Sequence, residues 1–166
     1  MKLKIEHLSL SFGDHRILDD LTFGVREREF VAILGPSGCG KSTILNILAG
    51  ILDEYKGKVE VDGKPINGMS RHFAYMPQND LLLEWKTILE NVSLYGTINH
   101  DRSMRQRALA TLKTFGLEGY ENAYPSSLSG GMRQRAAFLR TSLCDADILL
   151  LDEPFGALDV ITRNEM

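Results

Sequence analysis

The chain has 166 residues, 43% of them hydrophobic, which is enough for one domain with its own core. Its formal net charge of −3 gives no long-range attraction for nucleic acid or anionic lipid, so any bound anion must be held by local geometry. Two cysteines, Cys39 and Cys144, do not make a disulfide framework and favour a reducing cytoplasmic setting. The sequence contains neither a signal peptide nor an apolar run of membrane-spanning length. We expect a soluble chain, or one attached to a membrane through other proteins.

The first residues predict a strand and the start of a parallel sheet. Residues 2–12 alternate polar and apolar side chains like a half-buried strand, and the sequence GDHR that follows predicts a turn. The run EFVAILG, residues 29–35, predicts a short strand buried on both faces. The next run, KSTILNILAGIL, predicts an apolar helix over residues 41–52.

Two further strands are predicted before the middle of the chain. Residues 57–66 predict a strand that ends in a turn at Asp62 and Gly63. Residues 72–78 predict another strand, which Pro77 ends because proline cannot donate to a sheet.

Helices replace strands in the middle of the chain. Thr87 and Glu90 have the spacing of a capping box, and Gly96 is expected to end that helix. Asp101 and Ser129 are expected to cap two more helices. We interpret the apolar stripes of the three helices as core packing: Ile88, Leu89, Val92 and Tyr95; Met104, Ala108, Leu112 and Phe115; Met132, Ala136, Leu139 and Leu143. A buried strand over residues 148–151 then resumes the parallel sheet, so the helices form an insertion.

The sequence GPSGCGKST, Gly35 to Thr43, matches a phosphate-binding loop between a predicted strand and a predicted helix. Glycines let consecutive N–H groups point at one anion, and the helix N-terminus adds partial positive charge. Lys41 is placed to contact the β- and γ-phosphates and Ser42 to ligate Mg²⁺. The predicted ATP-binding residues are Gly35, Pro36, Ser37, Gly38, Cys39, Gly40, Lys41, Ser42 and Thr43. An ordinary glycine turn is the alternative, and Cys39 itself is best interpreted as a small tolerated side chain.

Two adjacent carboxylates follow the apolar residues ILLL. In a phosphate-loop fold, a second buried strand ends near the γ-phosphate, so Asp152 is predicted to hold the Mg²⁺ shell. Glu153 points elsewhere and is predicted to polarise the attacking water. Acidic residues also end strands for no catalytic reason, so this interpretation depends on the phosphate loop upstream.

The motif LSGGMRQ, Leu128 to Gln134, predicts a second helix N-terminus suited to an anion. One nucleotide does not need two such sites in one chain. A head-to-tail dimer would use both, with Ser129, Gly130 and Gly131 of each chain facing the partner's γ-phosphate. A plain capped helix after a glycine turn is the alternative.

These motifs, together with ILLLDEP and GALD, occur in the order found in the ATP-binding subunits of ABC transporters, which the whole chain resembles. The resemblance implies an α/β fold: a phosphate-loop (RecA-like) parallel-sheet core with an antiparallel N-terminal β part. Residues 1–78 and 144–166 would form this core, and residues 79–143 an inserted helical subdomain carrying the signature motif. The implied cofactors are ATP and Mg²⁺.

The resemblance also implies roles for individual residues. Gln78 corresponds to the Q-loop glutamine, which contacts Mg²⁺ and senses the γ-phosphate, so we expect catalytic roles for Gln78, Lys41 and Glu153 and metal contacts from Ser42, Gln78 and Asp152. Phe12 corresponds to the aromatic residue that stacks on adenine, although a core aromatic at a strand end is the alternative. Asp159 corresponds to the D-loop aspartate that crosses the dimer interface.

The segments PQNDLLLEWKTILENV and DEPFGALDVITR are similar to segments of the ATPases of nitrate, sulfonate and taurine importers. The ATPases for thiamine-precursor pyrimidines share much of this sequence. This likeness implies transport-coupled ATP hydrolysis at the cytoplasmic face of the membrane. The implied partners are transmembrane permease subunits, a second ATP-binding subunit and, indirectly, a solute-binding protein, with no nucleic acid. Trp85 and Leu81–Leu83 would be an apolar docking surface for the permease, or else core.

The sequence departs from the family at its end, because the family's switch histidine lies on a strand beyond the D-loop and the residues stop at Met166. In the family, that strand lies between the phosphate-loop strand and the strand that carries Asp152. Without it, buried N–H and C=O groups of these two strands would lack partners, and each such group would cost about 1–3 kcal/mol. We therefore interpret the chain as a fragment or early-terminated form without its C-terminal strands.

A nucleotide-binding remnant without turnover is the alternative function. A DNA-repair or chromosome-organising ATPase is disfavoured, because such proteins place long coiled coils before the signature motif and a basic DNA-binding stripe is missing.

Overall fold

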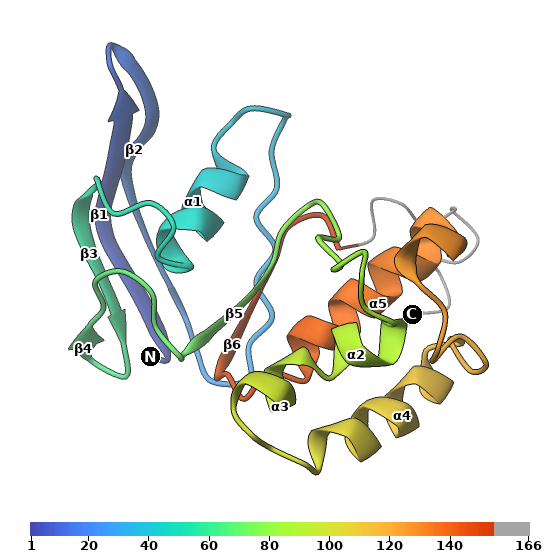
Figure 1. The fold of residues 1–166 in the computed structure, drawn as a ribbon. Coiled ribbons are helices and arrows are strands. Elements are labelled where there is room, and N and C mark those ends of the chain that lie inside the picture. Colours follow the sequence, from blue (N-terminus) through green and yellow to red (C-terminus); the bar gives the residue numbers. More distant parts are fainter. Residues whose placement is uncertain (155–166) are drawn as a thin grey trace. The chain divides into compact units, whose positions relative to one another are not determined.

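The computed structural model describes residues 1–154, and the chain divides into two compact units, Met1–Phe73 and Ala74–Met166. Figure 1 traces both units from the blue N-terminus to the red strand β6. Among the described residues, no helix combines the length and the apolar character needed to cross a bilayer.

The first unit contains a four-stranded antiparallel sheet in the order β2-β1-β3-β4. Its strands are β1 (Leu3–Phe12), β2 (His15–Val25), β3 (Lys56–Val61) and β4 (Lys64–Pro65). Leu3 faces Val25 on one side and Val61 on the other, which sets the register of the three long strands. The predicted strand over residues 2–12 and the turn after it are therefore confirmed.

A tight turn joins β3 to β4. Asp62 and Gly63 both have positive φ, 51° and 73°, as a two-residue hairpin of type I′ requires. The predicted turn at these two residues is confirmed.

Helix α1 (Lys41–Leu48) is shorter than the predicted span of residues 41–52. Gly50 has φ 74°, a left-handed conformation that commonly ends helices. A Cβ on Gly50 would lie 2.3 Å from Met69 N, so only glycine lets the chain turn this close to its neighbour. The buried apolar residues of the first unit come from the sheet and α1: Leu3, Ile5, Leu8, Leu10, Leu18, Ile44, Ile47, Leu48, Val59 and Val61.

The predicted buried strand over residues 29–35 is wrong. No strand forms there, and Phe30 and Leu34 are 86% and 89% exposed. An apolar run becomes a buried strand only where neighbouring strands pair with its backbone. The two sheets formed by residues 1–154 do not include this segment, so it has no neighbouring strand to pair with there.

In the second unit, β5 (Phe73–Met76) pairs with β6 (Ile148–Leu151), and the two strands lie side by side in Figure 1. The predicted end of β5 at Pro77 is confirmed. The prediction that β6 is wholly buried is wrong in part, because Leu150 is buried but Leu149 is 42% exposed. Alternate residues of a strand face opposite sides of the sheet, and neither side of β6 is buried along its whole length, since Ile148 and Leu151 are half-buried.

The helical insertion packs around one apolar core. It consists of α2 (Ile88–Val92), α3 (Leu94–Ile98), α4 (Met104–Thr114), a 3₁₀ turn (Pro125–Ser127) and α5 (Gly130–Ser142). Helix α5 contacts both α2 and α4. The predicted stripes are confirmed as core packing, with Tyr95, Phe115 and Met132 only partly buried at its edge.

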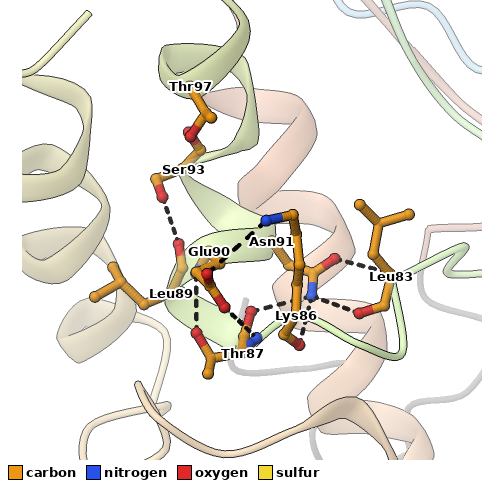
Figure 2. Close-up of polar contacts among 8 residues, drawn as sticks. All are labelled: Leu83, Lys86, Thr87, Leu89, Glu90, Asn91, Ser93 and Thr97. Atoms are coloured by element: carbon orange, nitrogen blue, oxygen red, sulfur yellow. Dashed lines mark hydrogen bonds and ion pairs between the residues drawn. The ribbon is translucent and has the colours of Figure 1, made fainter.

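The start of α2 is held by two sets of polar contacts, drawn in Figure 2. Thr87 N–H donates to Glu90 Oε2 at 2.8 Å and Glu90 N–H donates to Thr87 Oγ1 at 3.3 Å, which confirms the capping box. Asn91, fully buried, accepts from Leu83 N–H at 2.7 Å, and its Nδ2 lies within 3.1 Å of three backbone carbonyl oxygens, those of Leu83, Lys86 and Thr87. These contacts fix the loop before α2 onto the helix.

Two helix-boundary predictions are wrong. Gly96 lies inside α3 rather than at its end, because a Cβ there would lie 2.2 Å from Met104 Cβ and glycine is needed for close packing. Asp101 is not the N-cap of α4; Ser103 occupies that position. Asp101 instead accepts from Ser103 N–H at 2.9 Å and Ser103 Oγ at 2.7 Å, which orders the turn before the helix.

Candidate functional site

The backbone of the predicted phosphate loop depends on two glycines in the left-handed region. Gly38 has φ 80° and Gly40 has φ 95°. A Cβ on Gly40 would lie 2.9 Å from Leu18 Cδ2, so this glycine also lets the loop approach strand β2. Helix α1 begins at the next residue, and the structure therefore places its N-terminus directly after the loop.

Lys41 is the first residue of α1, and its ammonium group reaches back over the loop. It donates to the carbonyl oxygens of Gly35 at 2.9 Å and Pro36 at 2.8 Å. The first turn of α1 contains no acidic residue, and Ser42 is exposed. A helix N-terminus, a lysine and a free hydroxyl on one turn fit a phosphate group and its cation.

The remaining predicted loop residues, Pro36, Ser37 and Cys39, are exposed, and Thr43 is half-buried. Phe12, at the end of β1 in the same unit, is 54% exposed and faces His15 across the hairpin. The alternative that Phe12 is a core aromatic is therefore wrong. Its ring is available to a planar partner.

In the second unit, the two carboxylates at the end of β6 have different surroundings. Asp152 is 6% exposed, and its backbone N–H donates at 2.9 Å to the carbonyl oxygen of Met76, the last residue of β5. The Tyr75 phenol donates to the Asp152 carboxylate; burial first, then this negative charge, raises the pKa of Tyr75. Glu153 is exposed and has φ 49°, a conformation that costs a non-glycine residue about 1–3 kcal/mol.

Gln78 and Glu153 lie together after the ends of β5 and β6. Gln78 Nε2 donates to Glu153 Oε2 at 2.9 Å. From α5, the buried Gln134 donates through Nε2 to the Glu153 carbonyl oxygen at 3.0 Å. The carboxylate and the main chain of Glu153 are thus each held by a glutamine.

The signature motif forms the N-terminus of α5. Ser129 is the N-cap, with extended backbone, and its Oγ accepts from Met132 N–H at 3.3 Å. The predicted cap is confirmed. Gly130 is exposed and Gly131 half-buried. Asp159, the fourth residue predicted to contact a partner's nucleotide, lies outside the described residues.

Helix α5 also holds the segment that follows Gln78. Arg133 Nε pairs with Asp80 Oδ2 at 3.1 Å, and Arg140 donates to the carbonyl oxygens of Asp80 and Leu81, both at 2.7 Å. In this segment Leu81 and Trp85 are 61% and 73% exposed, whereas Leu82 belongs to the helical core. The predicted apolar surface therefore excludes Leu82, because its side chain packs into the core of the helical insertion.

The sequence model of the ABC transporter family matches residues 18–156, most of the chain. The chain belongs to the ABC transporter family. It is 41% identical over 99% of its length to a taurine import ATP-binding protein of Rhizobium johnstonii. It is 50% identical over 93% of its length to an aliphatic sulfonates import ATP-binding protein of Rhodococcus jostii. It spans 65% and 60% of these two relatives, less than two thirds of either.

A solved structure agrees with this assignment. The ABC transporter chain matches an ATP-binding cassette, solved as a dimer in a post-hydrolysis state with ADP and Pi, with a TM-score of 0.84 and 33% identity. The match covers 98% of this chain and 78% of the cassette. The predicted α/β phosphate-loop fold, with an antiparallel N-terminal sheet and a helical insertion, is confirmed.

Sequence reasoning on this ABC transporter chain missed Tyr75 and Gln134, which contact the two carboxylate residues, and Asp80 and Arg140, which hold the segment after Gln78. Tyr75 and Gln134 contact the Asp152–Glu153 pair from segments far away in the sequence. No local spacing could have found them. The one available signal was a glutamine on a helix whose neighbours Ala136 and Ala137 are apolar, which indicates a buried polar group in need of a partner.

Proposed function

We propose that this chain is an ATP-binding and ATP-hydrolysing subunit that drives import of a small solute such as taurine or an aliphatic sulfonate. The observation that carries the proposal is the phosphate loop: left-handed Gly38 and Gly40 lead into α1, and Lys41 reaches back over the loop. The relatives named above are a taurine import and an aliphatic sulfonates import ATP-binding protein, which supports the solute class.

ATP would bind through the first unit. The N–H groups of the loop and the Lys41 ammonium would contact the β- and γ-phosphates, and the Phe12 ring would stack on adenine. This assignment extends to Gly35, Pro36, Ser37, Gly38, Cys39, Gly40, Ser42 and Thr43. The exposure of Phe12 and of most loop residues supports it, since a bound nucleotide needs an open approach.

Hydrolysis would use the second unit as well. Glu153 would accept a proton from the attacking water, and Gln78 would orient that water or sense the γ-phosphate. Ser42, Gln78 and Asp152 have the oxygen donors that Mg²⁺ prefers and would hold it. Bound Mg²⁺ would offset negative charge on the phosphates. The hydrogen bond between Gln78 and Glu153 supports a shared role for these two side chains.

The signature motif and the exposed apolar residues would meet partner proteins. Ser129, Gly130, Gly131 and Asp159 would contact the nucleotide of a second ATP-binding subunit in a head-to-tail dimer. The dimeric form of the similar cassette supports this arrangement. Leu81 and Trp85 would contact a transmembrane permease subunit, which would hold the chain at the cytoplasmic face of the membrane, with a solute-binding protein acting on the other side.

We further propose that residues 1–78 and 144–166 form the nucleotide core and that residues 79–143 form a helical subdomain. The helices α2 to α5 lie within residues 88–142 and pack around one apolar core, which supports the bounds of the helical subdomain at residues 79 and 143.

Phosphate release from Mg-ATP tests the proposal directly. Lys41→Ala should abolish release, whereas Lys113→Ala, an exposed lysine on α4, should leave it unchanged. Binding of Mg-ATP without any release would support the alternative of a nucleotide-binding remnant. If the unaltered chain neither binds Mg-ATP nor releases phosphate, that result would contradict both functions.

A further inference from the structure

Gln134 is a buried polar residue that none of the predicted site roles uses. It lies on α5, 6% exposed, between the signature end of the helix and its apolar residues Ala136 and Ala137. Its Nε2 donates to the Glu153 carbonyl oxygen at 3.0 Å. A buried amide side chain must find hydrogen-bond partners, and this one finds the backbone of the residue that carries the exposed carboxylate.

The main chain around Glu153 is held on both sides of its Cα. On the N-terminal side, Asp152 N–H donates to Met76 O at 2.9 Å, next to the paired strands. On the C-terminal side, the Gln134 amide holds the carbonyl group. The residue between these two anchors, Glu153, has φ 49°. Residues other than glycine rarely adopt this backbone conformation unless their surroundings impose it.

The direction of the Glu153 side chain follows from this constrained backbone. The carboxylate lies where Gln78 Nε2 reaches it at 2.9 Å. Without the Gln134 bond, the carbonyl would lack this anchor, and the left-handed conformation would be free to relax. The Cα–Cβ direction would then change, and the carboxylate would move away from Gln78.

We propose that Gln134 is a positioning residue for Glu153: it fixes the backbone of Glu153 and thereby the direction of the carboxylate. The inference rests on the proposed function, in which Glu153 activates the attacking water. Gln134 itself touches neither nucleotide nor water in this account. Its loss should therefore lower the rate of the chemical step and leave nucleotide binding intact.

Three substitutions separate positioning from general packing. Gln134→Leu removes the donor and keeps a side chain of similar length. Gln134→Glu keeps the shape, but an ionised carboxylate cannot donate, whereas a protonated one can. Gln106→Leu on α4 is the matched control, because Gln106 is an exposed helical glutamine.

Steady-state phosphate release over a range of Mg-ATP concentrations is the main readout. Gln134→Leu should lower kcat about 10- to 100-fold, as expected for a misplaced reacting group, with KM for Mg-ATP changed by less than about threefold. Gln134→Glu should be as slow at about pH 8, and its rate relative to the unaltered chain should rise toward about pH 5 as the carboxyl gains a proton. Gln106→Leu should match the unaltered chain.

Three results would overturn the inference: a Gln134→Leu kcat within about twofold of the unaltered value, a KM that rises in step with the loss of kcat, or a pH-independent rate ratio for Gln134→Glu. Failure of the proposed function has a different signature, namely no Lys41-dependent phosphate release from the unaltered chain. Solvent exchange of side-chain amide protons then decides the inference without turnover. Gln134 should exchange at least about 10-fold more slowly than Gln106, and equal rates would contradict the hydrogen bond.

Discussion

Gln78 and Glu153, 75 positions apart in the sequence, are joined by a hydrogen bond of 2.9 Å. Each residue follows the end of a strand, β5 for Gln78 and β6 for Glu153, and those strands pair with each other. Sheet pairing therefore brings the two side chains together. Residues at the ends of neighbouring strands are placed with the precision of the sheet rather than that of a loop, which suits a pair that must hold a water molecule.

The role proposed for Glu153 predicts a separation of binding from turnover. Glu153→Gln keeps the size of the side chain but removes its basicity, so phosphate release should fall about 10²- to 10⁴-fold while Mg-ATP binding persists. Phosphate release and equilibrium nucleotide binding measure the two effects. Glu118→Gln, at an exposed glutamate, is the control. Undiminished release from Glu153→Gln would remove Glu153 from the role of general base.

The phosphate loop predicts a difference between its two left-handed glycines. Gly38→Ala should lose about 1–2 kcal/mol through backbone strain alone, because nothing lies within 4 Å of the added Cβ. Gly40→Ala has a similar strain and adds a contact of 2.9 Å with Leu18 Cδ2, so its free energy of unfolding should fall further. Thermal unfolding measures both. Equal midpoints for the two variants would show that the approach of Gly40 to β2 contributes nothing.

Asn91 predicts a large loss of stability at a residue far from the proposed chemistry. Asn91→Leu would leave the Leu83 N–H and the neighbouring carbonyls without their buried partner, at a cost of about 1–3 kcal/mol. Urea unfolding gives the free energy directly. Asn122→Leu, at an exposed asparagine, should change it by less than about 0.5 kcal/mol. An Asn91→Leu chain as stable as this control would mean that the network in Figure 2 is not formed.

The capping box predicts a pH dependence of stability. Hydrogen bonds from Thr87 lower the pKa of Glu90, with the larger effect from the backbone N–H of Thr87 and the smaller from its side chain. The folded state therefore favours the ionised carboxylate, and this stabilisation is fully present above the ordinary glutamate pKa of about 4.3. It is lost as the pH falls through the lower pKa of the folded state. Glu90→Gln can keep the hydrogen bond without the charge, so the stability advantage of the unaltered chain over Glu90→Gln should shrink on acidification. An advantage that is constant from about pH 3 to 7 would contradict this reading.

Local sequence patterns predicted the elements that depend on local chemistry. The capping box at Thr87 and Glu90, the Asp62–Gly63 turn and the Ser129 cap are each made by residues within a few positions of one another, and all three form as expected. The order of motifs was enough to predict the family and its fold. The individual site roles are proposals that the geometry supports.

The features that sequence reasoning missed depend on partners distant in the sequence. Phe30 and Leu34 have the composition of a buried strand, but burial requires neighbouring strands, which residues 1–154 do not supply to this segment. Gly96 ends no helix, because its lack of a side chain is used to approach Met104. Gln134 contacts Glu153 only because the fold brings α5 to the residues that follow β6, which no periodicity encodes.

The measurement that tests the account most directly is thermal unfolding of the chain with and without Mg-ATP, with Lys41→Ala as the control. The account predicts a cooperative transition whose midpoint rises with Mg-ATP in the unaltered chain and not in Lys41→Ala, since a ligand at about 100 times its Kd adds about 2.7 kcal/mol. A transition that ignores Mg-ATP, or that rises equally in Lys41→Ala, would contradict nucleotide binding by the phosphate loop.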